Sequence, residues 1–189
     1  FHREREADVT LAALPVPTPQ ASAFGVIATD EDGRVYDFQE KPEQPTHLPG
    51  DPNHAFASMG NYLFNTGVLL QTLQDTDDQG NTDFGQHLLP RMMRNHRMFA
   101  YNFEANKVAG IKSYEEPGYW RDVGNIESYY AAHRDLLGLK PRLDLFNPRW
   151  PIHSRGYEGP ATRIIDGHIE NSILAAGTVV NGASIKNSI

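Results

Sequence analysis

The chain has 189 residues, of which 39% are hydrophobic and 22% are charged; these values are typical of a globular protein and exclude wholesale disorder. It contains no cysteine, which excludes disulfides and thiolate metal sites and predicts a reducing, cytoplasmic location. Its net charge of −7 weighs against a nucleic-acid partner, and the lack of a signal peptide or of an apolar run of roughly 18 residues weighs against a membrane partner.

Four short segments predict strands in the first part of the chain. Val9–Leu14 is apolar and lies between a charged run and a proline cluster. Phe24–Ala28 and Val35–Phe38 flank an Asp-Gly dipeptide, which is typical of a β-hairpin. Ala57–Phe64 is the fourth segment, and the proline-rich residues 42–54 before it predict a loop.

Helical patterns follow these strands. A short helix is expected over Thr66–Gln74, and residues 75–81 predict a solvated loop. Asp83 can cap a helical stretch that runs to Met93, within which Pro90 must kink or restart the helix.

Strand-like segments at Met98–Phe103 and Val108–Ser113 lead to the clearest amphipathic helix of the chain. Its apolar residues recur with i, i+3, i+4, i+7 spacing between Ile126 and Leu137. Because strands and helices alternate this far, residues 1–137 predict a layered α/β domain.

The composition changes after this helix. Residues 138–163 are rich in glycine and proline and predict a linker. The pattern Ile-x-Asn-Ser-Ile at residues 169–173 recurs at 185–189, and aliphatic residues stand six apart between these two copies. Such a period predicts short parallel strands, the start of a β-helix over residues 164–189. Because the chain opens without methionine and holds only about two coils, we expect it to be a piece of a longer polypeptide.

The segment Phe38–Pro42 is the first candidate for chemistry. Lys41, at the end of a predicted strand, can bind a phosphate as a point charge, and Glu40 can accept hydrogen bonds from sugar hydroxyls. Spacing alone favours the simpler alternative, a surface Glu and Lys before a proline-rich loop.

The segment Glu116–Gly124 is the second candidate, since it places two aromatic residues, an arginine and an aspartate directly before the predicted helix. Asp122 could be an oxygen ligand for Mg²⁺. It could equally pair with Arg121 or serve the start of the helix.

Other candidate residues carry less information on their own. Ser58 lies among small residues that could let a ligand approach the backbone, and Asp83 could be an ordinary helix cap. The histidines show no metal-ligand spacing, so zinc is not expected.

Taken together, the motifs resemble those of bacterial glucose-1-phosphate adenylyltransferases (ADP-glucose pyrophosphorylases) in their order and approximate spacing, from Ala7 to Ile189. They are Ala21–Val26, Phe38–Pro42, Ala57–Gly60, Asp83–Gly85, Tyr119–Gly124 and Trp150–Ile152. The resemblance implies an incomplete nucleotidyltransferase domain of the Rossmann-like, GT-A type, followed by the start of a left-handed parallel β-helix. It implies transfer of adenylyl from ATP to α-D-glucose 1-phosphate with Mg²⁺, giving ADP-glucose and pyrophosphate as the first committed step of glycogen biosynthesis.

The resemblance also implies roles for individual residues. The positions that contact glucose 1-phosphate match Gly25, Glu40, Lys41 and Ser58, and those that line the sugar pocket match Asp83 and Trp120. Asp122 matches one of two metal-binding carboxylates, and Asp122 and Lys41 would act in catalysis. The family's glycine-rich loop and first metal-binding aspartate have no counterpart here, so we expect residues 1–189 alone to be inactive.

The resemblance further implies a homo-oligomer, a tetramer in the family, that small-molecule allosteric effectors regulate. Two alternatives stay open. The chain could belong to a regulatory paralogue that binds sugar phosphate or effector in a hetero-oligomer without catalysis, or to a nucleotidyltransferase for another sugar. The presence of Glu40, Lys41 and Asp122 favours catalysis, and the fit of Glu40 and Ser58 favours glucose.

Overall fold

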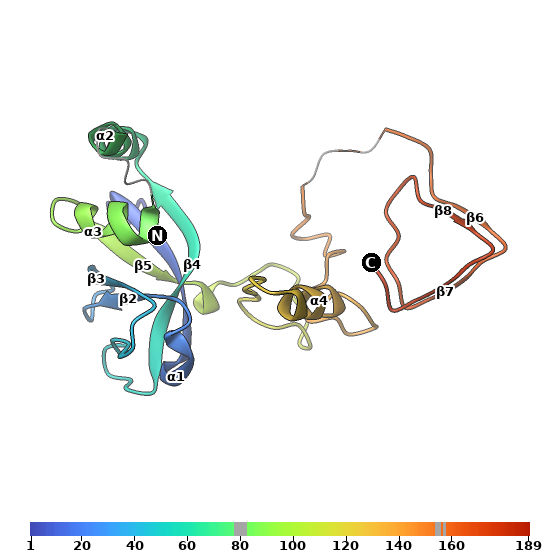
Figure 1. Cartoon of the computed structure of the whole chain (residues 1–189), viewed down its shortest axis with the longest axis horizontal. Coiled ribbons are helices and arrows are strands. Elements are labelled where there is room, and N and C mark those ends of the chain that lie inside the picture. The colour runs from blue at the N-terminus through green and yellow to red at the C-terminus, as the bar shows by residue number, and fades with distance from the viewer. Residues whose placement is uncertain (78–82, 154–155, 157) are drawn as a thin grey trace. The chain divides into compact units, whose positions relative to one another are not determined.

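This computed structural model describes residues 1–77, 83–153, 156 and 158–189. It divides into two compact units, Phe1–Asn106 and Lys107–Ile189 (Figure 1). The domain boundaries expected from the sequence, after residues 137 and 163, stay predictions.

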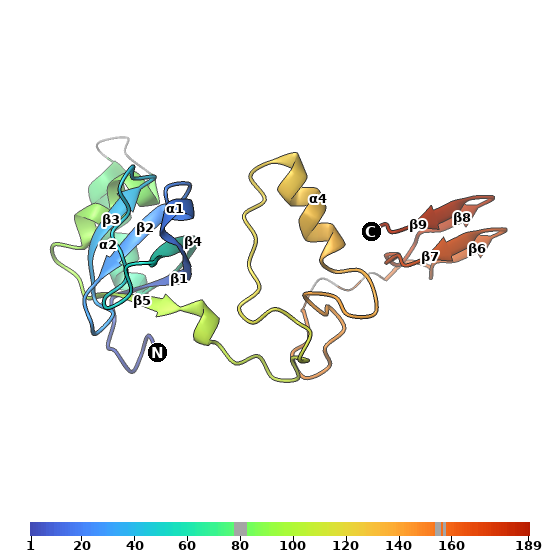
Figure 2. The ribbon, with the colours of Figure 1, turned by 90° about the horizontal axis from the view of Figure 1, so that it is seen from below.

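A five-stranded sheet in the order β3-β2-β4-β1-β5 forms the frame of the first unit (Figures 1 and 2). Its strands are β1 (Val9–Pro17), β2 (Gly25–Thr29), β3 (Val35–Glu40), β4 (His54–Phe64) and β5 (Met98–Asn102). Neighbouring strands run antiparallel, except that β1 and β5 run parallel. The predicted strands in this region are confirmed, and the mixed sheet confirms the α/β class.

Short helices complete the first unit. They are α1 (Thr18–Ala21), α2 (Thr66–Asp77), the π-helical turn η1 (Phe84–Leu88), α3 (Leu89–Met92) and the 3-10 turn η2 (Phe103–Ala105). Asp83 caps η1 as predicted, because its carboxylate accepts a hydrogen bond from the amide of Gln86 at 2.7 Å. Pro90 lies in the first turn of α3, where a missing amide hydrogen has no cost, so the helix restarts there.

The solvated loop predicted from residue 75 is wrong for its first three residues. Helix α2 continues through Asp77, and the Gln71 side chain donates to the Asp75 carboxylate one turn later at 2.9 Å. The rest of that predicted loop, residues 78–81, lies outside the described residues.

The core of this unit forms where one face of the sheet meets α3. Alternate residues of β1 point to this face, and Val9, Leu11 and Ala13 are fully buried. They belong to one cluster with Leu89 and Met92, the buried side chains of α3.

The second unit begins with a long irregular segment. The strand predicted over Val108–Ser113 is wrong: the chain turns at Gly110, whose φ is +79°, and the amide of Lys112 donates to the Glu115 carboxylate at 2.8 Å instead of to a neighbouring strand. The predicted amphipathic helix is confirmed as α4 (Ile126–Arg134), which Asn125 caps by accepting from the amide of Ser128 at 2.8 Å. The helix ends before Leu136 and Leu137, which the prediction had included.

The last part of the chain contains two parallel strand pairs. Strand β6 (Arg163–Ile165) pairs with β8 (Val179–Asn181), and β7 (His168–Glu170) pairs with β9 (Ser184–Lys186). In both pairs each residue faces the residue sixteen positions later, and at the same offset Asn171 donates to the side-chain oxygen of Asn187 at 2.6 Å. Two pairs do not establish a β-helix, which stays a prediction.

Candidate functional site

A cavity of about 420 Å³ in the first unit brings together four of the predicted site residues. They are Gly25, Glu40, Ser58 and Asp83, and the remaining lining residues are Phe38, Gly60, Tyr62, Phe84 and Gly85. This volume suits a small ligand. Residues far apart in the sequence therefore meet where strands β3, β2 and β4 lie side by side, next to the first turn of η1.

An irregularity in β4 shapes the floor of the cavity. Leu11 of β1 pairs with Tyr62, whereas Ala13, two residues later, pairs with Ser58, so β4 carries two extra residues between them. Gly60 lies in this bulge with a φ of +72°, a value that favours glycine. The bulge places Ser58 Oγ 3.2 Å from the Tyr62 hydroxyl, with which it shares a hydrogen bond.

Tyr62 was not among the residues predicted for the site. Burial raises the pKa of its phenol, and the nearby carboxylates of Glu40 and Asp83 raise it further, against the opposing hydrogen bond with Ser58. The phenol is therefore protonated at neutral pH and can donate a hydrogen bond. Its ring stacks on Phe84 with centroids 6.0 Å apart. The sequence did contain a signal for Tyr62: it is an aromatic residue four positions after Ser58 in the same predicted strand.

The cavity combines polar groups that suit a polyhydroxylated ligand. The carboxylates of Glu40 and Asp83 can accept hydrogen bonds from hydroxyl groups, and the Ser58 and Tyr62 hydroxyls can donate or accept them. The aromatic rings supply an apolar wall. Among the described residues that line the cavity, none carries a positive charge.

Lys41 follows Glu40 directly but does not line the cavity. Its backbone has a φ of +46°, an unusual value for a residue other than glycine, and its amide donates to the carbonyl of Phe24 at 3.1 Å. The side chain is exposed, and within the described part of the chain its ammonium has no recorded hydrogen bond or ion pair. Among the described residues it is therefore an unpaired cation at the end of β3.

The other two predicted site residues, Trp120 and Asp122, belong to the second unit, whereas the cavity lies in the first. Both simple alternatives for Asp122 are wrong. Arg121 binds Glu116 and Asp135 instead of its neighbour, and Asn125 caps the helix. The Asp122 carboxylate is exposed and has no recorded partner among the described residues.

Arg121 holds the segment around Asp122 in place. Its guanidinium donates to both carboxylate oxygens of Glu116, at 2.6 and 2.7 Å, and to Asp135 at 2.9 Å. These hydrogen bonds hold the pKa of Glu116 below its usual value. Arg121 also lies over the ring of Tyr119, 4.4 Å from the centroid.

The described residues contain no group of three or more His, Cys, Asp or Glu side chains that could bind a metal alone. A single exposed carboxylate still fits Mg²⁺, which usually binds one or two carboxylates together with substrate phosphates and water. Asp122 is chemically suited to that role. None of the helices in the described ranges is long and apolar enough to cross a membrane.

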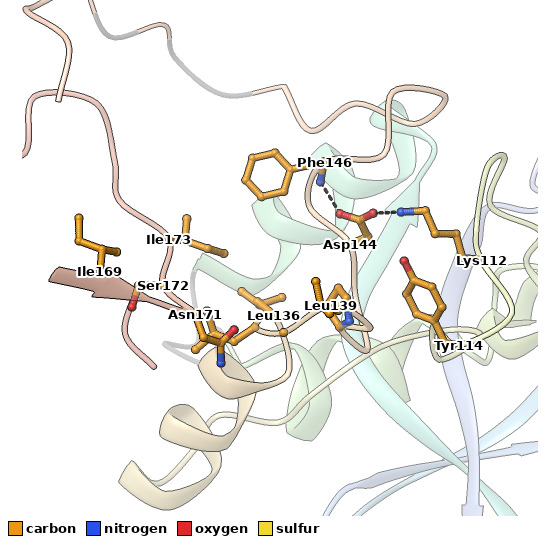
Figure 3. Close-up of a pocket in the computed structure, with 13 residues that line it drawn as sticks. Lys112, Tyr114, Leu136, Leu139, Asp144, Phe146, Ile169, Asn171, Ser172 and Ile173 are labelled. Atoms are coloured by element: carbon orange, nitrogen blue, oxygen red, sulfur yellow. Dashed lines mark hydrogen bonds and ion pairs between the residues drawn. The ribbon is translucent and has the colours of Figure 1, made fainter. Parts of the chain in front are cut away.

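Figure 3 shows a second cavity, of about 750 Å³, within the second unit. Lys112 at its wall pairs with Asp144, which also accepts from the amide of Phe146 at 2.9 Å. Among the described residues that line this cavity, Lys112 is the one cation and it is already paired, so a phosphate would find no unpaired positive side chain there.

Comparison with known proteins assigns the family. A sequence model described as nucleotidyl transferase matches residues 1–138. The chain belongs to the nucleotidyl transferase family.

Individual members of this family are similar along the whole chain. A glucose-1-phosphate adenylyltransferase of Thermodesulfovibrio yellowstonii is 49% identical over 189 residues, which are 100% of this chain and 46% of the relative. Those of Thermus thermophilus and Geobacter metallireducens are 41% and 43% identical, and the matches cover 100% of this chain and 47% of each relative. The resemblance to glucose-1-phosphate adenylyltransferases is confirmed, and the chain spans about half the length of the relatives it matches.

Proposed function

We propose that this chain forms the glucose 1-phosphate-binding part of an enzyme that transfers adenylyl from ATP to α-D-glucose 1-phosphate. The products are ADP-glucose and pyrophosphate. The observation that carries the proposal is the cavity that unites Gly25, Glu40, Ser58 and Asp83. The family and the similarity to glucose-1-phosphate adenylyltransferases support it.

Each polar group of the cavity has a role in this proposal. Glu40 and Asp83 accept hydrogen bonds from the sugar hydroxyls, and Ser58 and Tyr62 complete the hydrogen bonding. The free ammonium of Lys41 holds the phosphate as a point charge. Recognition of several hydroxyls by the polar groups of the cavity selects one sugar over others, because a sugar that lacks a hydroxyl leaves its partner unpaired.

In the reaction a phosphate oxygen of glucose 1-phosphate attacks the α-phosphorus of ATP, and the bond to the pyrophosphate breaks. The protein has little covalent chemistry to perform, so it acts by positioning the reactants and by neutralising charge. Asp122 would hold Mg²⁺, which neutralises phosphate charge when it is bound. Trp120 would contribute to the sugar site.

We also propose the finer features that the resemblance implies. They are a role in glycogen biosynthesis, a cytoplasmic location, a homo-oligomer, control by small-molecule effectors and a left-handed β-helix from residue 164. The sixteen-residue offset of both strand pairs supports the β-helix. No observation on the described residues favours a non-catalytic regulatory subunit.

The test is the reaction of the whole protein with ATP, glucose 1-phosphate and Mg²⁺. We expect release of pyrophosphate together with ADP-glucose, identified by mass spectrometry. Galactose 1-phosphate and GTP in place of the natural substrates provide specificity controls. A protein that forms no ADP-glucose, or that uses galactose 1-phosphate equally well, would contradict the proposal.

A further inference from the structure

The carboxylate of Glu40 lies close to two glycines of the cavity, Gly25 and Gly85. Gly25 pairs with Glu40 across the β2–β3 hairpin, and a Cβ at Gly25 would lie 3.3 Å from Glu40 Oε2 and 2.7 Å from Phe38 Cζ. A Cβ at Gly85, in the first turn of η1, would lie 3.1 Å from the same Glu40 oxygen. Any side chain at either position must therefore displace its neighbours.

The backbone of Gly85 does not require glycine. Its φ lies outside the left-handed region, and the residue is part of a helical turn, where alanine is more favourable than glycine by up to about 1 kcal/mol. The local backbone thus gives glycine no advantage here. Glycine instead leaves room for its neighbours: a Cβ added at Gly85 would also lie 3.2 Å from Phe38 Cε1 and 3.6 Å from Asp83 Oδ1.

We infer that Gly85 is a positioning residue for the sugar site. Because it has no side chain, the Glu40 carboxylate can take the position from which it meets the sugar. The inference rests on the proposed function. Gly85 touches no reacting atom and acts only through Glu40. It differs in this from Gly60, whose left-handed φ favours glycine and whose added Cβ would meet nothing within 4 Å.

The test substitutes Gly85→Ala in the whole protein. Displacement of the carboxylate should raise the KM for glucose 1-phosphate roughly ten- to hundredfold, the loss expected for one charge-assisted hydrogen bond. The KM for ATP should stay unchanged, and the melting temperature should not fall. The matched control is Gly67→Ala, at the second residue of α2, where the added Cβ meets nothing within 4 Å and no kinetic change is expected.

A double-mutant cycle separates positioning from a purely structural role. In a Glu40→Ala background, Gly85→Ala should change the KM for glucose 1-phosphate no further, because the group through which it acts is gone. Additive losses would overturn the inference. So would a marked fall in melting temperature of Gly85→Ala, since contact with Phe38 would then dominate.

The failure of this inference can be distinguished from failure of the proposed function. If the wild-type protein makes no ADP-glucose, the proposed function fails and the inference fails with it. If the wild-type protein is active and Gly85→Ala keeps its KM for glucose 1-phosphate, only the inference about Gly85 is overturned.

Discussion

Removal of the Arg121 side chain should loosen the segment that carries Asp122. Its short contacts join two carboxylates, and hydrogen bonds to charged groups contribute roughly 1.5–3 kcal/mol each when they are well buried. The side chains of Arg121 and Glu116 remain 26% and 36% exposed, and Arg142 stays within 3.5 Å of both carboxylates. After allowance for solvent screening, we expect Arg121→Ala to cost about 2–3 kcal/mol of local stability.

Hydrogen exchange followed by mass spectrometry can measure this loss directly. The amide of Glu116 donates to Arg142 at 2.9 Å, and that of Arg142 donates to Asp135 at 2.7 Å, so both amides report opening of the segment. A loss of about 2–3 kcal/mol corresponds to roughly 30- to 150-fold faster exchange. Arg121→Lys keeps a charge but not the planar fork, and we expect an intermediate effect.

Two controls define the result that would refute the reasoning. Arg134 is exposed on α4, and among the described residues its guanidinium contacts Tyr130 alone. Arg134→Ala should therefore have little effect on hydrogen exchange over residues 112–144. Peptides from β1 should be unaffected by either change. If Arg121→Ala left exchange over residues 112–144 at the wild-type rate, the contacts of Arg121 would not hold the segment.

Lys41→Ala should lower kcat/KM for glucose 1-phosphate by roughly 30- to 150-fold, because a charged phosphate contact is lost, while the KM for ATP stays unchanged. Steady-state kinetics with each substrate varied will measure both values. An unchanged kcat/KM for glucose 1-phosphate would contradict the role of Lys41. Asp122→Asn should lower kcat by about 100-fold or more without lowering the melting temperature, since the amide keeps the shape but not the charge; near-normal turnover across a Mg²⁺ titration would remove Asp122 from the proposal. Glu116→Gln should be less stable than wild type at neutral pH. The folded-state pKa of Glu116 is lowered, so its contribution is present above its ordinary value near 4.5 and is lost in acid. Urea unfolding should therefore show that the difference in unfolding free energy between wild type and Glu116→Gln is smaller at about pH 3 than at neutral pH. A difference that does not change with pH would argue against the ion pair.

The sequence predicted the strands of the first unit because their apolar residues follow a simple local pattern. The apolar run Val9–Leu14, bounded by a charged run and a proline cluster, predicted β1, and the Asp-Gly turn predicted the β2–β3 hairpin; both are confirmed. The parallel pairing of β1 with β5 and the bulge in β4 depend on contacts between distant segments, which a local pattern does not contain. The position of Tyr62 in the cavity follows from that bulge, which explains why it was missed.

The errors in the second unit have the same origin. The apolar residues of Val108–Ser113 matched a strand, but the buried carboxylate of Glu115 takes the amides of Lys112 and Asp144 and keeps this segment irregular. Asp122 seemed a natural partner for Arg121 because it is adjacent in sequence. The structure instead pairs Arg121 with carboxylates five and fourteen residues away.

The charges of the cavity decide how a sugar phosphate would enter it. Glu40 and Asp83 line it, and the described lining residues include no cation. A phosphate brought within 4 Å of one carboxylate would be repelled by about 4 kcal/mol per unit charge at an effective dielectric constant of 20. The hydroxyls of the ring gain hydrogen bonds from the same carboxylates. In the proposed function the ring therefore enters the cavity and the phosphate stays outside it, where the exposed ammonium of Lys41 is available. The attacking oxygen belongs to this phosphate, so the two carboxylates that select the sugar also leave the nucleophile accessible to ATP.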